Sequence, residues 1–368
     1  MYDRFVGHRI NASVLPTDDY PEILRQVVMP IAPPGMTQVH LNDGTTTQAN
    51  ESALTVALLK YAENHKIQDV SQLCVLGFEN GYHGNSIGTL SCSDSRVNLQ
   101  EVPTYDWPRA PFPNIQYPMA QFEHENRAEE DRCLEEIRKI VKARRDAKKD
   151  VAAIIIEPIS SYENRMATPY FYKRLREIAL NNEIPFVVDE TKTGVGSTGK
   201  MWGHEHWNLS TPADIVTFGG KAGISGFYST VNYRLDLLQQ EYKYSFEQNV
   251  DMVKLLNFGV TWKHIQHKNL LSYVMDTSTF LKIELARIEK EKGYISNVRG
   301  YGTFLGFDVE NKEIADNLQK WYFRSGINLL RCGLLTFGLR PALILGPKQG
   351  AILRENMLNY SPNFVNHH

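Results

Sequence analysis

Three apolar runs decide the fold of this chain: Val151-Ala-Ala-Ile-Ile-Ile-Glu157, Pro185-Phe-Val-Val-Asp-Glu190 and Ala213-Asp-Ile-Val-Thr-Phe-Gly-Gly-Lys221. The spacing from Glu157 to Asp189 is 32 residues, and the spacing from Asp189 to Lys221 is 32 again. Each interval has room for one helix and its loops, which predicts a repeated strand–helix–strand unit. Short Val- and Ile-rich runs separated by helical patterns are typical of buried parallel strands, so we expect an α/β fold.

Each of these strands ends in polar residues, and in such sheets the ligand lies beyond the carboxyl ends of the strands. There Asp189 and Lys221 would stand side by side. A carboxylate that pairs with a pyridinium nitrogen and an amine that forms a Schiff base are what pyridoxal phosphate requires. Strands also end in Asp or Lys for reasons of solubility, so the pair alone leaves both interpretations open.

Composition narrows the class of protein. The chain has 368 residues, enough for two domains, and its 42% hydrophobic and 22% charged residues are ordinary for a globular protein. A formal net charge of −2 gives no reason to expect a nucleic-acid partner. No apolar stretch is long enough to span a membrane. The four cysteines lack metal-ligand spacing and suit a reducing compartment, and we expect no metal site.

The rest of the chain divides into two parts. The pattern predicts helices over Gln48–Asn64 and Glu125–Asp150 in the first part. In the second part it predicts a helix over Leu270–Lys292 and strands over Asn297–Val309 and Leu335–Leu345. We therefore expect a large cofactor-binding-type domain over residues 1–262 and a smaller α+β domain over residues 263–368.

Several further motifs combine with the three strands. They include Thr198-Gly-Lys-Met-Trp-Gly-His-Glu-His-Trp207, Asp106-Trp107-Pro108, Cys133-Leu-Glu-Glu136, Gly302-Thr-Phe304 and Arg340-Pro341. Together the motifs strongly resemble 4-aminobutyrate aminotransferases of the eukaryotic mitochondrial type, within the class III pyridoxal-phosphate aminotransferases. The likeness covers nearly the whole chain. The family has a substantial segment ahead of the point where this chain begins, so the resemblance implies a shortened member.

The resemblance implies an aspartate-aminotransferase-like fold of type I, with a large mixed, mostly parallel sheet and a small C-terminal domain. It also implies a homodimer with active sites at the subunit interface, and a mitochondrial location, although this chain shows no presequence. Asp189 would pair with the pyridinium nitrogen of pyridoxal phosphate and Lys221 would be the catalytic Schiff-base lysine. Tyr82 would stack on the cofactor ring, and Arg340 would engage a substrate carboxylate.

Departures from the family pattern affect both the cofactor and the substrate. The phosphate-binding turn of the family corresponds to Gly44, Thr45 and the residues after them, and this turn is expected to carry two extra residues that displace amide donors. Asn85 replaces the arginine that grips the 4-aminobutyrate carboxylate, so a charge-assisted fork is lost. A family glutamate is replaced by Tyr162. A family glutamine is replaced by Lys192, which puts a second cation near the cofactor site.

Three hypotheses follow. The chain is either an active aminotransferase that transfers an amino group from an omega-amino acid such as 4-aminobutyrate to a 2-oxo acid, or a degenerate relative. In the second case it serves as a structural or accessory subunit of a larger mitochondrial assembly. The departures from the family pattern favour this second hypothesis, because a shared fold does not by itself imply a shared function. The third hypothesis is that pyridoxal phosphate binds Lys221 as a structural or regulatory ligand.

Overall fold

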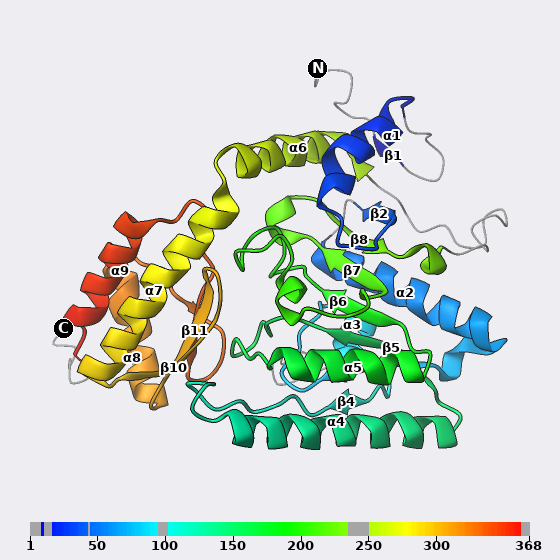
Figure 1. Cartoon of the computed structure of the whole chain (residues 1–368), viewed down its shortest axis with the longest axis horizontal. Coiled ribbons are helices and arrows are strands. Elements are labelled where there is room, and N and C mark those ends of the chain that lie inside the picture. Colours follow the sequence, from blue (N-terminus) through cyan, green and yellow to red (C-terminus); the bar gives the residue numbers. More distant parts are fainter. Residues whose placement is uncertain (1–8, 11–16, 43–44, 95–101, 235–249, 362–368) are drawn as a thin grey trace.

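A seven-stranded mixed sheet forms the centre of the larger part of the molecule (Figure 1). The computed structural model describes residues 9–10, 17–42, 45–94, 102–234 and 250–361. The strand order is β2-β8-β7-β6-β5-β3-β4, and β8 alone runs against the other six strands. The strands are β2 (Gln38–Asn42), β3 (Cys74–Phe78), β4 (Arg109–Ala110), β5 (Val151–Ile156), β6 (Phe186–Asp189), β7 (Ile215–Phe218) and β8 (Ser225–Ser229). The predicted α/β class and mostly parallel sheet are therefore confirmed.

Helices cover both faces of this sheet, as the alternation of strand side chains requires. In β5, Ala153 and Ile155 pack against α2 (Thr46–His65) together with Val187 and Ile215 of the neighbouring strands. Ile154 and Ile156 belong to the core cluster on the opposite face, which includes residues of α4 (Glu123–Asp146) and α5 (Pro169–Asn181). All six residues of β5 are buried, and each large aliphatic side chain contributes about 1.5–3 kcal/mol to folding.

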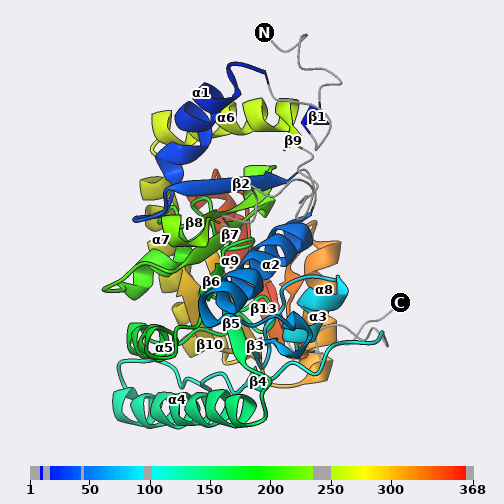
Figure 2. The same cartoon turned by 90° about the vertical axis from the view of Figure 1, so that its right-hand side faces the viewer.

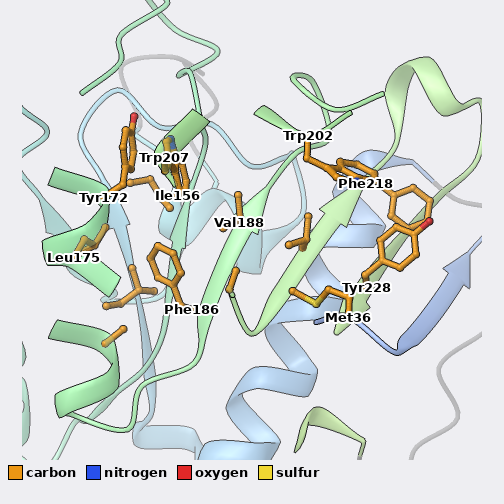
Figure 3. Packing of buried hydrophobic residues seen from close by; sticks show 14 of the residues in the cluster. Met36, Ile156, Tyr172, Leu175, Phe186, Val188, Trp202, Trp207, Phe218 and Tyr228 are labelled. Carbon is orange, nitrogen blue, oxygen red and sulfur yellow. The ribbon is translucent and has the colours of Figure 1, made fainter. Parts of the chain in front are cut away.

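The core on the α5 side is rich in aromatic rings (Figure 3). Tyr172 and Trp207 stack with their ring centroids 4.0 Å apart, and Trp207 comes from the short 3-10 helix η5 (Gly203–Trp207). At the other end of the cluster, Trp202 Nε1 donates a hydrogen bond to the Ile31 carbonyl at 2.7 Å. Rings of this size bury a large apolar area, and their polar edges find partners. These contacts fix the segment after β6 to α5 and to the backbone at Ile31.

The segments that join the main elements are short. They comprise α1 (Tyr20–Ile23), η2 (Leu24–Val28), η3 (Met29–Ile31), η4 (Val70–Gln72), α3 (Ile87–Cys92), η6 (Gly220–Ala222) and η7 (Val231–Tyr233). A two-stranded ladder pairs β1 (Arg9–Ile10) with β9 (Val250–Asp251). Next to this ladder, η2 contacts α6 (Met252–His267), and α1 lies beside α6 (Figure 2).

The smaller part is a four-stranded antiparallel sheet in the order β10-β11-β13-β12. Its strands are β10 (Ile295–Tyr301), β11 (Phe304–Val309), β12 (Leu330–Arg331) and β13 (Thr336–Leu339). It packs with α7 (Leu270–Lys292), α8 (Lys312–Arg324) and α9 (Pro347–Asn359) around a core separate from that of the large sheet. The division into domains at residue 262 stays a prediction.

Two predicted elements of the smaller part need correction. The strand predicted over Asn297–Val309 is a hairpin of β10 and β11 that turns at Gly302, whose φ of 55° favours glycine. The strand predicted over Leu335–Leu345 ends at Leu339, because Pro341 follows shortly after and cannot donate a ladder hydrogen bond. The helix predicted over Leu270–Lys292 is confirmed at both ends.

Candidate active site

Asp189 lies at the carboxyl end of β6, with its side chain 1% exposed. Its Oδ2 accepts hydrogen bonds from Asn50 Nδ2 and His83 Nδ1, each at 2.8 Å. Its Oδ1 accepts from the Thr191 amide at 3.0 Å and from the Thr191 hydroxyl at 2.6 Å. Burial raises the pKa of the Asp189 carboxyl, but the bonds from His83 and Thr191 outweigh burial, so the pKa lies below its ordinary value. These hydrogen bonds therefore favour the ionised form of the carboxylate.

A second tier of contacts holds these donors in place. Asn50 comes from the first turns of α2, and its Nδ2 also donates to the His83 carbonyl at 2.7 Å. The Thr217 hydroxyl on β7 donates to Asn50 Oδ1 at 2.6 Å. Asn50 therefore joins α2, the loop after β3 and two sheet strands at one point. The sequence interpretation did not place Asn50, His83 or Thr217 in the site, because they come from three separate parts of the chain.

Lys221 follows β7, and its amine donates a hydrogen bond to the Pro341 carbonyl at 3.1 Å. This contact joins the large sheet to the segment after β13. Burial lowers the pKa of the Lys221 amine, and the positive charge of Arg340 lowers it further. A lysine with a lowered pKa is a better nucleophile at neutral pH, because a larger fraction of it is uncharged.

The N-terminus of α2 lies next to the Lys221 loop. A Cβ added at Gly219 would come 2.5 Å from Thr46 Cγ2, so the two segments are closely packed. Thr45 is the N-cap residue of α2, and its side chain makes no capping hydrogen bond. Gly44, the other predicted residue of the phosphate turn, lies outside the described residues. The two extra residues predicted for this turn stay a prediction.

Lys192 and Tyr82 form a pair that the sequence did not predict. The Lys192 amine lies 4.1 Å from the centroid of the Tyr82 ring and donates to Ser161 Oγ at 2.6 Å. Ser161 Oγ in turn donates to Glu157, which also accepts a 3.0 Å bond from the Tyr82 amide. Burial lowers the pKa of Lys192, while Glu157 and Asp189 raise it.

Asn85 lies at the exposed end of the loop that carries Tyr82. The Tyr82 hydroxyl donates to Asn85 Oδ1 at 2.9 Å, and the Asn85 amide donates to Thr47 Oγ1 at 3.3 Å. The carboxamide therefore links two neighbouring segments but offers no positive charge to a substrate carboxylate. Its position is compatible with the predicted loss of the family arginine.

Arg340 follows β13 and reaches back to the loop after β5. Its Nη2 donates to the Ser161 carbonyl at 2.7 Å and to Asn164 Oδ1 at 2.9 Å, and its guanidinium lies 4.6 Å from the centroid of the Phe304 ring. Burial lowers the pKa of Arg340. Among the described residues no carboxylate lies within ion-pair distance of Arg340. The guanidinium is therefore held by neutral groups at the edge of the site.

Tyr162, which the resemblance predicts in place of a family glutamate, does not supply a counterion for Arg340. Tyr162 carries no charge, and the neighbouring Glu163 pairs with Arg165 at 2.7 Å instead. Glu163 has a φ of 61° and Asn164 a φ of 47°, so the turn is left-handed at two successive residues. This turn directs the Asn164 amide, not a carboxylate, to Arg340.

The fit of pyridoxal phosphate to these residues can be tested on two contacts. An ionised carboxylate has about four acceptor positions, and five protein hydrogen bonds already end on Asp189, the longest a 3.5 Å bond from the Thr217 hydroxyl. The Lys192 amine takes a face of Tyr82, the ring on which the cofactor is expected to stack. Lys221 has the position and lowered pKa that the cofactor requires, but the aspartate and the tyrosine do not fit it as they stand.

Other candidate ligands in the chain have structural partners. His204 Nδ1 donates to Glu190 at 2.7 Å, and His206 Nε2 donates to the Thr198 carbonyl at 3.1 Å. Within the ranges that the structure describes, no group of three or more His, Cys, Asp or Glu residues could hold a metal ion. In the same ranges no helix is long and apolar enough to cross a membrane.

Comparison with known proteins gives concordant matches. Residues 10–358 match the family model "Aminotransferase class-III". The 4-aminobutyrate aminotransferase of Dictyostelium discoideum is 34% identical, over 94% of this chain and 73% of that protein. The mitochondrial 4-aminobutyrate aminotransferases of Sus scrofa and Homo sapiens are each 32% identical, over 90% of this chain and 69% of theirs. These matches confirm the resemblance seen in the sequence.

Solved structures agree on the fold. The lysine aminotransferase of M. tuberculosis in the internal aldimine form superimposes with a TM-score of 0.83 at 20% identity, covering 96% of this chain and 82% of that one. A transaminase W58L variant with SMBA gives a TM-score of 0.82 at 15% identity, covering 95% and 85%. At these identities the likeness establishes the fold, which is the predicted aspartate-aminotransferase-like one.

Proposed function

The chain belongs to the class III aminotransferase family, and we propose that it is a 4-aminobutyrate-aminotransferase-like protein that does not transaminate. In this proposal it serves as a structural or accessory subunit of a larger mitochondrial assembly. The observation that supports the proposal is the pair formed by Lys192 and Tyr82, with the amine 4.1 Å from the centroid of the ring on which the resemblance predicts that the cofactor stacks.

Two further features of the site favour the absence of turnover. Asp189 already accepts five protein hydrogen bonds, so a pyridinium N–H would have to displace at least one of them. Asn85 offers a carboxamide where the family has an arginine, which weakens the orientation of a 4-aminobutyrate carboxylate. Orientation of the substrate and electrostatic stabilisation of the transition state both contribute strongly to catalysis. Weaker contacts to the cofactor and to the substrate should therefore both lower the rate.

The well-packed core supports a role in which the chain contributes its fold to an assembly and performs no catalysis. The strands that end in Glu157, Asp189 and Lys221 are buried, and Asp189 joins α2 to the sheet through Asn50. These contacts stabilise the protein whether or not a cofactor is present. Residues of this kind persist in a scaffold because packing and hydrogen bonding require them.

A second candidate function has one observation in its favour. The pKa of Lys221 is lowered by burial and by Arg340, as nucleophilic attack on an aldehyde requires. On this alternative, pyridoxal phosphate attaches to Lys221, and the chain transfers an amino group from an omega-amino acid such as 4-aminobutyrate to a 2-oxo acid. Attachment without turnover, as a structural or regulatory ligand, is the intermediate case.

The visible absorption spectrum of the native protein, before and after borohydride reduction, separates these possibilities. A protein that is colourless, and stays so with added pyridoxal phosphate, agrees with the proposal. Colour that reduction fixes on a Lys221 peptide, together with a spectral change on adding 4-aminobutyrate, establishes the enzyme and refutes the proposal. Colour on Lys221 that no amino donor changes identifies the intermediate case.

The location and partners are part of the same proposal. The pig and human relatives are named mitochondrial, and this supports a mitochondrial location for the present chain. We propose that its partners are either a second copy, in a homodimer, or the subunits of a larger complex. Fractionation of cells followed by native electrophoresis of the mitochondrial extract tests both. Recovery of the protein outside mitochondria would contradict the location, and a band at the monomer mass would contradict the assembly.

A further inference from the structure

Lys192 occupies an unusual environment for a lysine. Its amine lies over the Tyr82 ring and donates to Ser161, and among the described residues it has no carboxylate within ion-pair distance. Burial of a cation is costly unless strong contacts replace its hydration. Here the replacement is a ring face at 4.1 Å and a hydroxyl at 2.6 Å. The residues that make these contacts, Tyr82 and Ser161, are both held by hydrogen bonds to Glu157.

The backbone from which Lys192 extends is held by its neighbours. The amide and hydroxyl of Thr191 both bind Asp189, and the Glu190 amide donates to the Thr217 carbonyl at 3.1 Å. The stem of Lys192 therefore starts from a defined point at the carboxyl end of β6. The direction of the Lys192 side chain is set by this hydrogen-bonded backbone.

The far end of the side chain is anchored as well. Ser161, which accepts the Lys192 bond, donates from its hydroxyl and from its amide to Glu157. Glu157 also accepts the amide of Tyr82, so the same carboxylate positions the ring and the hydroxyl that together hold the amine. Burial and the positive charge of Arg340 lower the pKa of Lys192, and Glu157 and Asp189 only partly offset this effect, so the pKa stays below its ordinary value. The Lys192 amine is thus held over the Tyr82 ring by its contact with the ring and by its hydrogen bond to Ser161.

We propose that Lys192 is the residue that keeps an aromatic cofactor ring out of this site. The proposal rests on the proposed function, because it names the side chain that makes the site unsuited to the family cofactor. A planar pyridine ring can stack on the face of Tyr82 that the Lys192 amine occupies only if the ammonium leaves it, which requires loss of both the cation–π contact and the bond to Ser161. The family glutamine at this position carries no such charge.

The test is the affinity of the purified chain for pyridoxine 5′-phosphate, which has the ring and phosphate of the cofactor but no aldehyde. It therefore reports on the ring site without covalent attachment to Lys221. Equilibrium dialysis measures the dissociation constant for the wild type, Lys192→Gln and Lys192→Met. We expect both variants to bind about tenfold to a hundredfold more tightly than the wild type, because a cation–π contact and a charged hydrogen bond no longer compete.

Two control variants make the result specific. Lys282→Gln removes another lysine whose pKa burial lowers and whose amine lies 5.9 Å from a tyrosine ring, that of Tyr301, outside this site. It should leave the affinity unchanged. Ser161→Ala keeps the Lys192 charge but removes its acceptor, and should give an intermediate gain. Circular dichroism checks that each variant is folded, and Lys192→Met serves if Lys192→Gln is not.

The outcomes separate this inference from the proposed function. Equal affinities for the wild type and the Lys192 variants overturn the inference, even if the wild type has no aminotransferase activity. An equal gain in Lys282→Gln also overturns it, because the effect would then be one of general charge. If the wild type transaminates, the cofactor ring enters the site in the presence of Lys192, and both the inference and the proposed function fall.

Discussion

Asp189→Asn should destabilise the cofactor-free protein, and the cost can be worked out from its contacts. The substitution keeps the shape of the side chain but replaces one acceptor oxygen by an amide that donates. The new amide would face either Asn50 and His83 or the two Thr191 donors. Asn50 cannot rotate its carboxamide to accept, because its Nδ2 also donates to the His83 carbonyl and its Oδ1 accepts from Thr217.

His83 offers only partial relief. Its Nδ1 could accept in the other tautomer, but its proton would then lie on Nε2, which is buried and has no partner among the described residues. At least one buried donor is therefore stranded if the new amide faces Thr191, and two are stranded if it faces Asn50 and His83, at about 1–3 kcal/mol each. We expect a loss of roughly 2–4 kcal/mol in the free energy of unfolding.

Urea unfolding followed by tryptophan fluorescence measures this loss, since Trp202 and Trp207 are buried in the large core. Asp18→Asn at an exposed site is the control and should change stability by less than about 0.5 kcal/mol. A value for Asp189→Asn within the same range would refute the reasoning, because the network around Asp189 would then not hold the strand ends together. A large loss without cofactor would explain why a non-catalytic chain keeps this aspartate.

Three further predictions concern single residues. Lys221→Ala should abolish any colour acquired from pyridoxal phosphate yet leave the melting temperature nearly unchanged, since its amine is a partly buried cation that makes one hydrogen bond among the described residues, to Pro341; unfolding would show that the lysine serves structure. Asn85→Arg should not restore 4-aminobutyrate turnover in a coupled assay, because Lys192 still covers Tyr82; measurable turnover would contradict this. Burial lowers the pKa of His40 from 6.5 to about 4, so the unfolded chain takes up a proton before the folded one and stability falls as the pH drops from 6.5 towards 4, by about 3 kcal/mol. His40→Gln should flatten that part of the profile in unfolding experiments between pH 4.5 and 7.5, and an unchanged slope would count against it.

Much of the fold could be predicted because its signals are local. The apolar runs that become β5, β6 and β7 carry no charged side chain before their carboxyl ends except Asp214, which lies just ahead of β7 and pairs with Arg176. Hydrophobic periodicity gave α2 and α7 nearly at their observed bounds. Hydrophobic periodicity was less reliable for the ends of strands, where the chain turns. A glycine turn divided one predicted strand, and Pro341 followed the early end of another.

The site was less accessible from the sequence. Asp189 and Lys221 were placed at strand ends by spacing alone, and the structure locates both at the carboxyl edge of the sheet. The contacts of Asn50, His83 and Thr217 with one another and with Asp189 join positions up to 167 residues apart. A hydrogen bond between such positions leaves no periodic pattern, because each residue alone is an ordinary polar residue of a helix, loop or strand.

The sequence by itself determined the order of the elements, the burial of the strands and the family, because each depends on residue type and on spacing along the chain. The tertiary structure alone decided which charges meet. It brought the Lys192 amine onto Tyr82 and the Lys221 amine to Pro341, and it left Arg340 among neutral groups. Electrostatic and cation–π energies depend on distances of a few ångströms between segments remote in sequence, and folding alone sets those distances.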